Sequence, residues 1–307
     1  MLGYITDPAA PGGLVRRDLP EPVPGEHDVV IDVSAYAVNR GELMLLQRRP
    51  DGWSPGQDVA GVVAAAAADG TGPEVGTRVV GLADGAGWSE RVPVPSHRVA
   101  TLPEQVSYAA AAALPVAGLT ALRALRTGGS LLGKQVLVTG ATGGVGSFAV
   151  QLARIAGARV TAHVSGDARV DEARTLGPDD VVTSVDEDTG PFDFVLDGVG
   201  GTVLTDAIRR LASGGIATAY GLAGGEQSKL AFFDFSAAAP TGHLQGFFIY
   251  RTGEQTFGAD LAVLADLVAD GRLEPSLGVV RHWSETVDAV DSLRRRQVTG
   301  KVVLTRS

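Results

Sequence analysis

The stretch that decides the fold is Gly140-Ala141-Thr142-Gly143-Gly144-Val145-Gly146. It follows the apolar run Gln135–Thr139 and opens a helical pattern over Val145–Ala156 that ends at Gly157. In a strand–turn–helix of this kind, Gly143 lets the backbone approach a pyrophosphate, and Gly146 lets the helix pack against the strand. The helix N-terminus then offers N–H groups and a partial positive charge to the phosphates. The segment predicts a dinucleotide-binding turn; the alternative is a plain strand–turn–helix that binds nothing.

The segments around this turn predict two kinds of β-structure. Short runs with turn residues between them precede Ser107, among them Asp28–Val33, Val59–Ala67 and Arg78–Leu82, and they predict a small antiparallel unit that resembles a barrel. Beyond Lys134, apolar strands alternate with helical segments, which predicts a parallel sheet covered on both faces. The further strands expected there are Arg159–Val164, Asp180–Thr183, Phe192–Asp197, Ile216–Tyr220 and Leu244–Tyr250.

Composition limits the kinds of function. The 307 residues suffice for about two domains, and the net charge of −9 disfavours nucleic acid as a partner. The absence of cysteine excludes disulfides, thiolate catalysis and thiolate metal sites. No apolar run approaches the roughly 18 residues that span a bilayer, and the N-terminus lacks the pattern of a signal peptide. We therefore expect a cytoplasmic protein that does not enter a membrane.

The residues that select between NADH and NADPH are expected at the end of the strand that follows the glycine-rich turn and its helix. Dinucleotide-binding domains that use NAD place an acid there to hold the ribose 2′-OH. Here the position is Ser165, which can donate to a 2′-phosphate, and Arg169 can reach the same group with a charged fork. These residues predict NADPH. Asp167 is interpreted as the N-cap of a helix that begins at Ala168; if it faces the ribose instead, NADH would be used.

Several short motifs together resemble the medium-chain dehydrogenase/reductase superfamily, in particular its quinone oxidoreductase branch and the related polyketide enoyl reductases. The matching pieces, in chain order, are Ala37–Arg40, Gly56–Val63, Ala110–Leu114, Ala117–Ala121, Ala141–Gly146, Val150–Ala153, Asp197–Gly201 and Gly300–Leu304. The resemblance implies an α/β protein in which a doubly wound Rossmann sheet is inserted into a GroES-like β-barrel catalytic domain. We expect the catalytic domain at residues 1–114 and 253–307 and the NADP-binding domain at residues 115–252.

The resemblance also implies roles for individual positions. Asn39 and Thr120 match residues near the nicotinamide and its ribose, and Ser165 with Arg169 matches the 2′-phosphate region. The other expected cofactor-binding residues are Gly143, Gly144, Val145 and Gly146 at the pyrophosphate, Gly221 after a sheet strand, and Phe247, Phe248 and Ile249 facing the nicotinamide.

Two departures from the family pattern bear on the chemistry. Zinc-dependent members carry Gly-His-Glu and a cysteine ligand, whereas this chain has Gln57 in place of that histidine, no cysteine, and five scattered histidines. Because catalytic zinc needs three nitrogen, sulfur or carboxylate ligands, we expect no metal. Many relatives also place a tyrosine five residues after the asparagine, where this chain has Met44.

These observations predict an NADPH-dependent, zinc-independent reduction of a quinone or another α,β-unsaturated carbonyl compound. Asn39 is the expected catalytic residue, donating a hydrogen bond to the substrate oxygen as charge develops on it. Tyr36 and Tyr250 are interpreted as packing residues, and the proton is expected from solvent. The alternatives are a biosynthetic enoyl or enone reductase and a non-catalytic NADPH-binding protein. A homodimer is expected through the strand at Leu244–Tyr250, because that apolar run would lie unprotected at a sheet edge.

Overall fold

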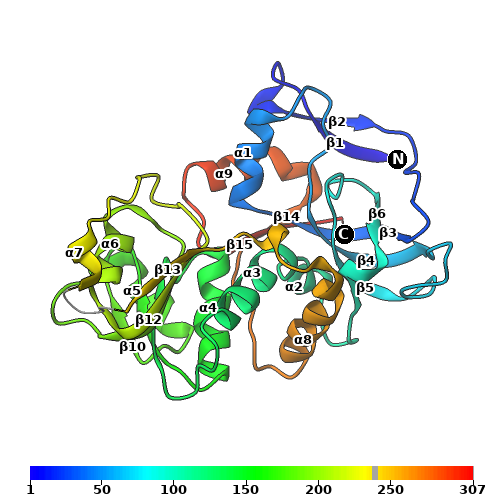
Figure 1. Cartoon of the computed structure of the whole chain (residues 1–307). Helices are drawn as coiled ribbons and strands as arrows, with labels where there is room; N and C mark the ends of the chain where they lie inside the picture. The colour runs from blue at the N-terminus through cyan, green and yellow to red at the C-terminus, as the bar shows by residue number, and fades with distance from the viewer. Residues whose placement is uncertain (237–240, 307) are drawn as a thin grey trace. The chain divides into compact units, whose positions relative to one another are not determined.

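The glycine-rich turn joins strand β8 (Gln135–Thr139) to helix α4 (Gly144–Ile155), as the sequence predicts. In the computed structural model, which describes residues 1–236 and 241–306, the chain divides into two units (Figure 1). Unit 1 comprises Met1–Leu119 and Tyr250–Ser307, and unit 2 comprises Thr120–Ile249. The α/β fold class is confirmed, and the expected assignment of catalytic and NADP-binding domains stays a prediction.

Unit 2 is built on a six-stranded sheet in the order β10-β9-β8-β11-β12-β13. Every neighbouring pair is parallel. The strand order reverses between β8 and β11, and in open α/β sheets such a switch point is where ligands bind, beyond the carboxyl ends of the strands. The other elements are β9 (Arg159–His163), α5 (Val170–Thr175), β10 (Asp180–Val182), β11 (Phe192–Asp197), α6 (Gly201–Arg209), β12 (Leu211–Ala219), α7 (Phe232–Ser236) and β13 (His243–Gly246).

Unit 1 is built on a seven-stranded sheet in the order β14-β15-β3-β4-β5-β7, with β6 paired to β3. All its pairs are antiparallel except β14 with β15. Its core includes the stacked rings of Tyr36 and Trp88, whose centroids lie 6.0 Å apart. The strands are β3 (Asp28–Val38), β4 (Asp58–Ala65), β5 (Arg78–Leu82), β6 (Arg91–Pro95), β7 (Val99–Thr101), β14 (Leu277–His282) and β15 (Lys301–Thr305), with β1 (Leu2–Thr6) and β2 (Leu14–Asp18) forming a separate pair.

The remaining helices are α1 (Arg40–Arg48), α2 (Tyr108–Ala112), α3 (Pro115–Arg126), α8 (Phe257–Ala269) and α9 (Thr286–Arg294). In unit 1, α1 and α9 lie side by side (Figure 1). Pro115 is the first residue of α3. Proline is well tolerated there because the first N–H of a helix has no intrahelical partner to lose.

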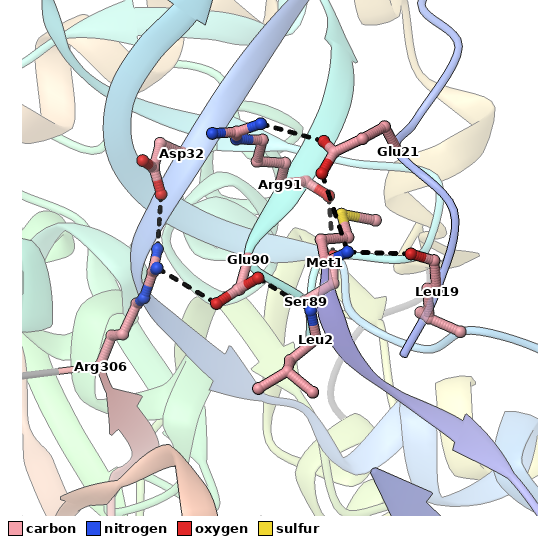
Figure 2. Close-up of polar contacts among 9 residues, drawn as sticks. All are labelled: Met1, Leu2, Leu19, Glu21, Asp32, Ser89, Glu90, Arg91 and Arg306. Carbon is pink, nitrogen blue, oxygen red and sulfur yellow. Dashed lines mark hydrogen bonds and ion pairs between the residues drawn. The ribbon is translucent and has the colours of Figure 1, made fainter. Parts of the chain in front are cut away.

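A surface charge network joins the strands of unit 1 at one corner (Figure 2). Arg306 lies between Asp32 and Glu90, at 2.6 and 3.2 Å, and Glu90 accepts a hydrogen bond from the backbone N–H of Leu2 at 2.8 Å. Beside Arg306 lies an open hollow of about 430 Å³. Because Asp32 and Arg306 in its wall pair with each other, the hollow offers a ligand little unsatisfied charge.

Candidate functional site

The turn at residues 140–146 is a backbone cradle that admits no side chain at one position. A Cβ on Gly146 would lie 2.2 Å from the carbonyl oxygen of Gly140, and Gly140 itself has a φ of 62°. Gly143 is the exposed N-cap of α4, and Gly144 and Val145 are half-buried. The first N–H groups of a helix have no carbonyl one turn earlier, so this end of α4 fits the pyrophosphate of a dinucleotide.

The predicted 2′-phosphate residues lie on the next strand–helix connection of unit 2. Nη1 of Arg169 donates to Oγ1 of Thr142 at 3.3 Å, which brings the guanidinium onto the glycine-rich turn. Ser165 is exposed just past β9. Asp167 is also exposed, and it begins a short 3₁₀ turn, Asp167–Arg169, whose cap residue is Gly166. The interpretation of Asp167 as a helix N-cap is therefore wrong, because the chain makes this 3₁₀ turn before α5 begins.

At the switch point, side chains tie the carboxyl ends of β8 and β11 together. Oδ1 of Asp197 accepts a hydrogen bond from Thr139 at 2.6 Å, and Oδ2 accepts one from the backbone N–H of Gly200 at 2.9 Å. Burial raises the pKa of Asp197. The sequence supplied Asp197 and Gly200 only as part of a family motif, and the structure shows that their contacts, with Thr139, hold the loop between β11 and α6.

The other expected cofactor-binding residues of unit 2 are distributed over three segments. Gly221 follows β12, packed so closely that a Cβ there would lie 2.9 Å from the carbonyl oxygen of Gly198. Phe247 is half-buried and donates its N–H to Ala219 at 2.8 Å, Phe248 is exposed, and Ile249 is buried. Thr120 is buried within α3.

Asn39 belongs to a buried polar cluster in unit 1 that it forms with Glu42, Asp58 and Lys301. Its Nδ2 donates to Oδ2 of Asp58 at 2.9 Å and to Oε2 of Glu42 at 3.4 Å. Nζ of Lys301 donates to Oδ1 of Asn39 at 2.6 Å and to Oδ2 of Asp58 at 2.9 Å. The predicted donor amide is thus directed at two carboxyl groups, and its catalytic role stays a prediction.

The cluster links three segments that are distant in sequence. Asn39 precedes α1, Glu42 lies in its first turn, Asp58 begins β4, and Lys301 begins β15. Oδ1 of Asp58 also accepts the N–H of Val116 at 2.8 Å, in the first turn of α3, where negative charge complements the helix dipole. The sequence named Asp58 and Lys301 only within family motifs and did not indicate that they would meet.

Glu42 is the carboxyl group of this cluster that holds a proton near neutral pH. Burial, reinforced by the charge of Asp58, raises the pKa of Glu42 to about 8, against the opposing effects of the Asn39 N–H and of Lys301. The fully buried Lys301–Asp58 pair is neutral, so an ionised Glu42 would leave one uncompensated negative charge in the interior.

Replacing Glu42 with glutamine should remove a pH dependence of stability. The folded state keeps a proton that the unfolded carboxyl group releases above its ordinary pKa of 4.5, so wild-type stability should fall as pH rises from about 5 to about 8. Glutamine retains an acceptor for the Asn39 N–H and cannot ionise. Between pH 5.5 and 8.5, urea unfolding should show the wild type losing about 2–4 kcal/mol relative to Glu42→Gln. The exposed Glu104→Gln is the control, and parallel curves for wild type and Glu42→Gln would contradict this assignment.

The two candidate tyrosines differ in their surroundings. Tyr36 is fully buried, with its hydroxyl 2.6 Å from Oγ1 of Thr286, which agrees with a packing role. Tyr250 is 38% exposed. Burial of the phenol oxygen, together with Asp58 and Glu42, raises the pKa of Tyr250.

Within residues 1–236 and 241–306, no group of three histidine, cysteine, aspartate or glutamate side chains is arranged to hold a metal ion. None of the described helices combines the length and apolar character that crossing a bilayer demands.

Two protein families match separate parts of the chain. The family described as "Alcohol dehydrogenase GroES-like domain" matches residues 25–104, and the one described as "Zinc-binding dehydrogenase" matches residues 144–266. The first match lies within unit 1, and the second begins at the N-terminus of α4.

Three relatives illustrate the range of similar proteins. The chain is 29% identical to the bovine quinone oxidoreductase-like protein 2 over 95% of its own length and 88% of that protein. It is 32% identical to a polyketide synthase of Streptomyces halstedii over 91% of its own length, a region that spans 5% of that synthase. The structure of the quinone oxidoreductase from Thermus thermophilus, described also in complex with NADPH, is similar with a TM-score of 0.83 and 30% identity, covering 99% of this chain and all of that one.

Proposed function

Because the chain belongs to the medium-chain dehydrogenase/reductase superfamily as a quinone oxidoreductase-like enzyme that uses NAD(P)H, we propose that it reduces quinones or other α,β-unsaturated carbonyl compounds with NADPH and without zinc. The observation that carries this proposal is the pairing of the glycine-rich turn with Arg169 in unit 2. The turn fits a pyrophosphate, and the guanidinium beside it suits a 2′-phosphate.

The proposed substrate class follows from what the side chains can supply. NADPH, when bound, supplies a hydride. Gln57 replaces the histidine of zinc-dependent relatives, and the polar cluster behind it is neutralised by Lys301 rather than by a metal ion. Without a Lewis acid, the protein can stabilise a developing oxyanion only through hydrogen bonds, which favours acceptors whose negative charge is delocalised, such as quinones and enones. We keep Asn39 as the proposed donor of a hydrogen bond to the substrate oxygen; its amide is held in place by Asp58 and Glu42.

A substrate panel tests this proposal. We expect NADPH oxidation with small quinones or enones that is unchanged by a chelator and occurs without bound zinc in elemental analysis. Turnover of enoyl thioesters alone would favour the biosynthetic enoyl reductase, which the similarity to polyketide synthases also supports. NADPH binding without reduction of any compound in the panel would favour a non-catalytic NADPH-binding protein.

Arg169→Ala should weaken NADPH binding selectively. Loss of a charged hydrogen bond to the 2′-phosphate costs about 1–3 kcal/mol, whereas NADH has no such phosphate, and its affinity should barely change. Titration of both cofactors by fluorescence measures this, with Arg174→Ala as control, because Arg174 lies on α5 and pairs on the surface with Asp171. Equal losses for both cofactors would refute the assignment, and tighter NADH binding by the parent would point to Asp167.

We also expect a homodimer that forms through β13. This strand is the edge of the unit 2 sheet, all four of its residues are exposed, and none is lysine or proline. It is shorter than the predicted Leu244–Tyr250, because a 3₁₀ turn, Ile249–Arg251, follows it closely. An open edge of this kind favours pairing with a second copy. Light scattering at micromolar concentration should give the mass of a dimer, and a monomer there would contradict this expectation.

A further inference from the structure

The side-chain amide of Asn39 has two N–H hydrogens, and the buried cluster of unit 1 holds them unequally. One is donated to Oδ2 of Asp58 at 2.9 Å, an ordinary length for a hydrogen bond. The other is directed at Oε2 of Glu42 at 3.4 Å, beyond the usual limit of about 3.2 Å. The second N–H is therefore the one that another acceptor can take from the cluster at small cost.

The rest of Asn39 is held in one orientation. Nζ of Lys301 donates to Oδ1 of Asn39 at 2.6 Å, and an ammonium group can only donate. An inverted amide would direct its N–H groups at that ammonium and its oxygen at Asp58. The backbone N–H of Asn39 also donates to Oε2 of Glu42 at 2.8 Å. The two N–H groups thus have fixed directions before any ligand binds, as a preorganised donor requires.

The two oxygens of Glu42 differ in their partners. Oε2 accepts the backbone N–H of Asn39, whereas Oε1 is buried and has no hydrogen-bond partner within residues 1–236 and 241–306. A neutral carboxyl group has little need of the second N–H of Asn39. An ionised carboxylate attracts it, because hydrogen bonds to a charged group are shorter and about twice as strong as neutral ones.

Glu42 is the member of this cluster that changes charge near pH 8, the value to which burial and the charge of Asp58 raise its pKa. Asp58 from β4 and Lys301 from β15 neutralise each other. Burial raises the pKa values of Tyr36 and Tyr250, which also sense the charge of Glu42, above the ordinary 10.0. The other charged residues on α1 and on α9, which packs against it, are exposed or paired: Arg40, Arg48 and Asp288 are exposed, and Asp291 pairs with Arg294.

We propose that Glu42 controls whether Asn39 can donate to the substrate oxygen: the neutral carboxyl group leaves the second N–H available, and the ionised carboxylate takes it. This inference rests on the proposed function, in which Asn39 is the donor, and it makes Glu42 a positioning residue. When the conjugated carbonyl accepts a hydride, an electron pair moves onto its oxygen. The second N–H of Asn39 stabilises that oxyanion until solvent supplies a proton.

A single NMR signal tests this control without turnover. Asn39 is the only asparagine among the 307 residues, so ¹⁵N-asparagine labelling reports its side-chain amide alone. Between pH 6.5 and 9 this signal should shift in the parent with a midpoint near pH 8 and stay constant in Glu42→Gln, which cannot ionise. Glu104→Gln, a change at an exposed carboxyl group, should titrate as the parent does. A parent signal that does not shift, or one that shifts equally in Glu42→Gln, would overturn the inference.

Single-turnover oxidation of bound NADPH separates this inference from the proposed function. If the parent reduces a quinone or an enone, its rate should fall about tenfold between pH 7 and pH 9 as Glu42 ionises, and Glu42→Gln should remove that fall. An active parent whose rate does not follow the Asn39 signal refutes the role of Glu42 and leaves the proposed function standing. A parent that reduces no conjugated carbonyl refutes the proposed function, and the NMR titration then still decides whether Glu42 holds the second N–H.

Discussion

Gly146→Ala should lower the affinity for NADPH at least about 100-fold, which corresponds to about 2.7 kcal/mol. The added methyl would lie 2.2 Å from the carbonyl oxygen of Gly140 and 2.9 Å from Cα of Ala141. Both are backbone atoms of the turn, so no flexible side chain can move aside. Relief requires α4 to separate from the end of β8, and that displaces the N–H groups proposed to bind the pyrophosphate.

Isothermal titration with NADPH and with NADH measures this effect, and both affinities should fall together, in contrast to the selective loss expected for Arg169→Ala. Gly41→Ala is the matched control, because a Cβ at Gly41, in the first turn of α1, meets no atom within 4 Å. Far-UV circular dichroism verifies that the variant remains folded. A folded Gly146→Ala that binds NADPH as the parent does would show that residues 140–146 are not the cofactor turn.

Lys301→Met should lower the free energy of unfolding by about 3–5 kcal/mol, the cost typical of removing one partner from a buried ion pair. Asp58 is fully buried and Lys301 is 2% exposed, so solvent cannot replace the lost ammonium group. The substitution also removes the donor to Oδ1 of Asn39. Because Lys301 starts β15 and Asp58 starts β4, the damage should extend across the sheet of unit 1.

The double variant Asp58→Asn with Lys301→Met shows whether the stability lost by Lys301→Met comes from the unpaired charge of Asp58 or from altered packing. Neutralising both partners removes the uncompensated buried charge, so urea unfolding should place the double variant closer to the parent than Lys301→Met alone. A surface comparison is Arg306→Met, whose ion pairs with Asp32 and Glu90 are partly exposed (Figure 2) and should contribute at most about 1 kcal/mol. A loss below 1 kcal/mol for Lys301→Met would show that the cluster contributes little to stability.

The parallel sheet could be predicted because its information is local in sequence. Gln135–Thr139 and Phe192–Asp197 have the bounds expected from apolar runs between turn residues, and so does Arg78–Leu82 in the other, mainly antiparallel sheet. β14 escaped prediction because its burial alternates only between half-buried and exposed positions, which leaves a weak hydrophobic pattern. The end of β13 was also placed wrongly, because apolar residues continue past Gly246 into a 3₁₀ turn.

The candidate site likewise has one part that the sequence predicted and one part that only the structure revealed. Residues 140–146 form one contiguous motif, and backbone sterics require glycine at position 146, so the sequence alone predicted the turn proposed to bind the dinucleotide. Only the tertiary structure brought Lys301 to Asp58, 243 positions apart. Contacts of that kind depend on strand order and register, which no local pattern encodes. The sequence therefore determined the fold and the glycine-rich turn. The pairing of β15 with β3 and of β3 with β4 decided which polar side chains lie together in the buried cluster.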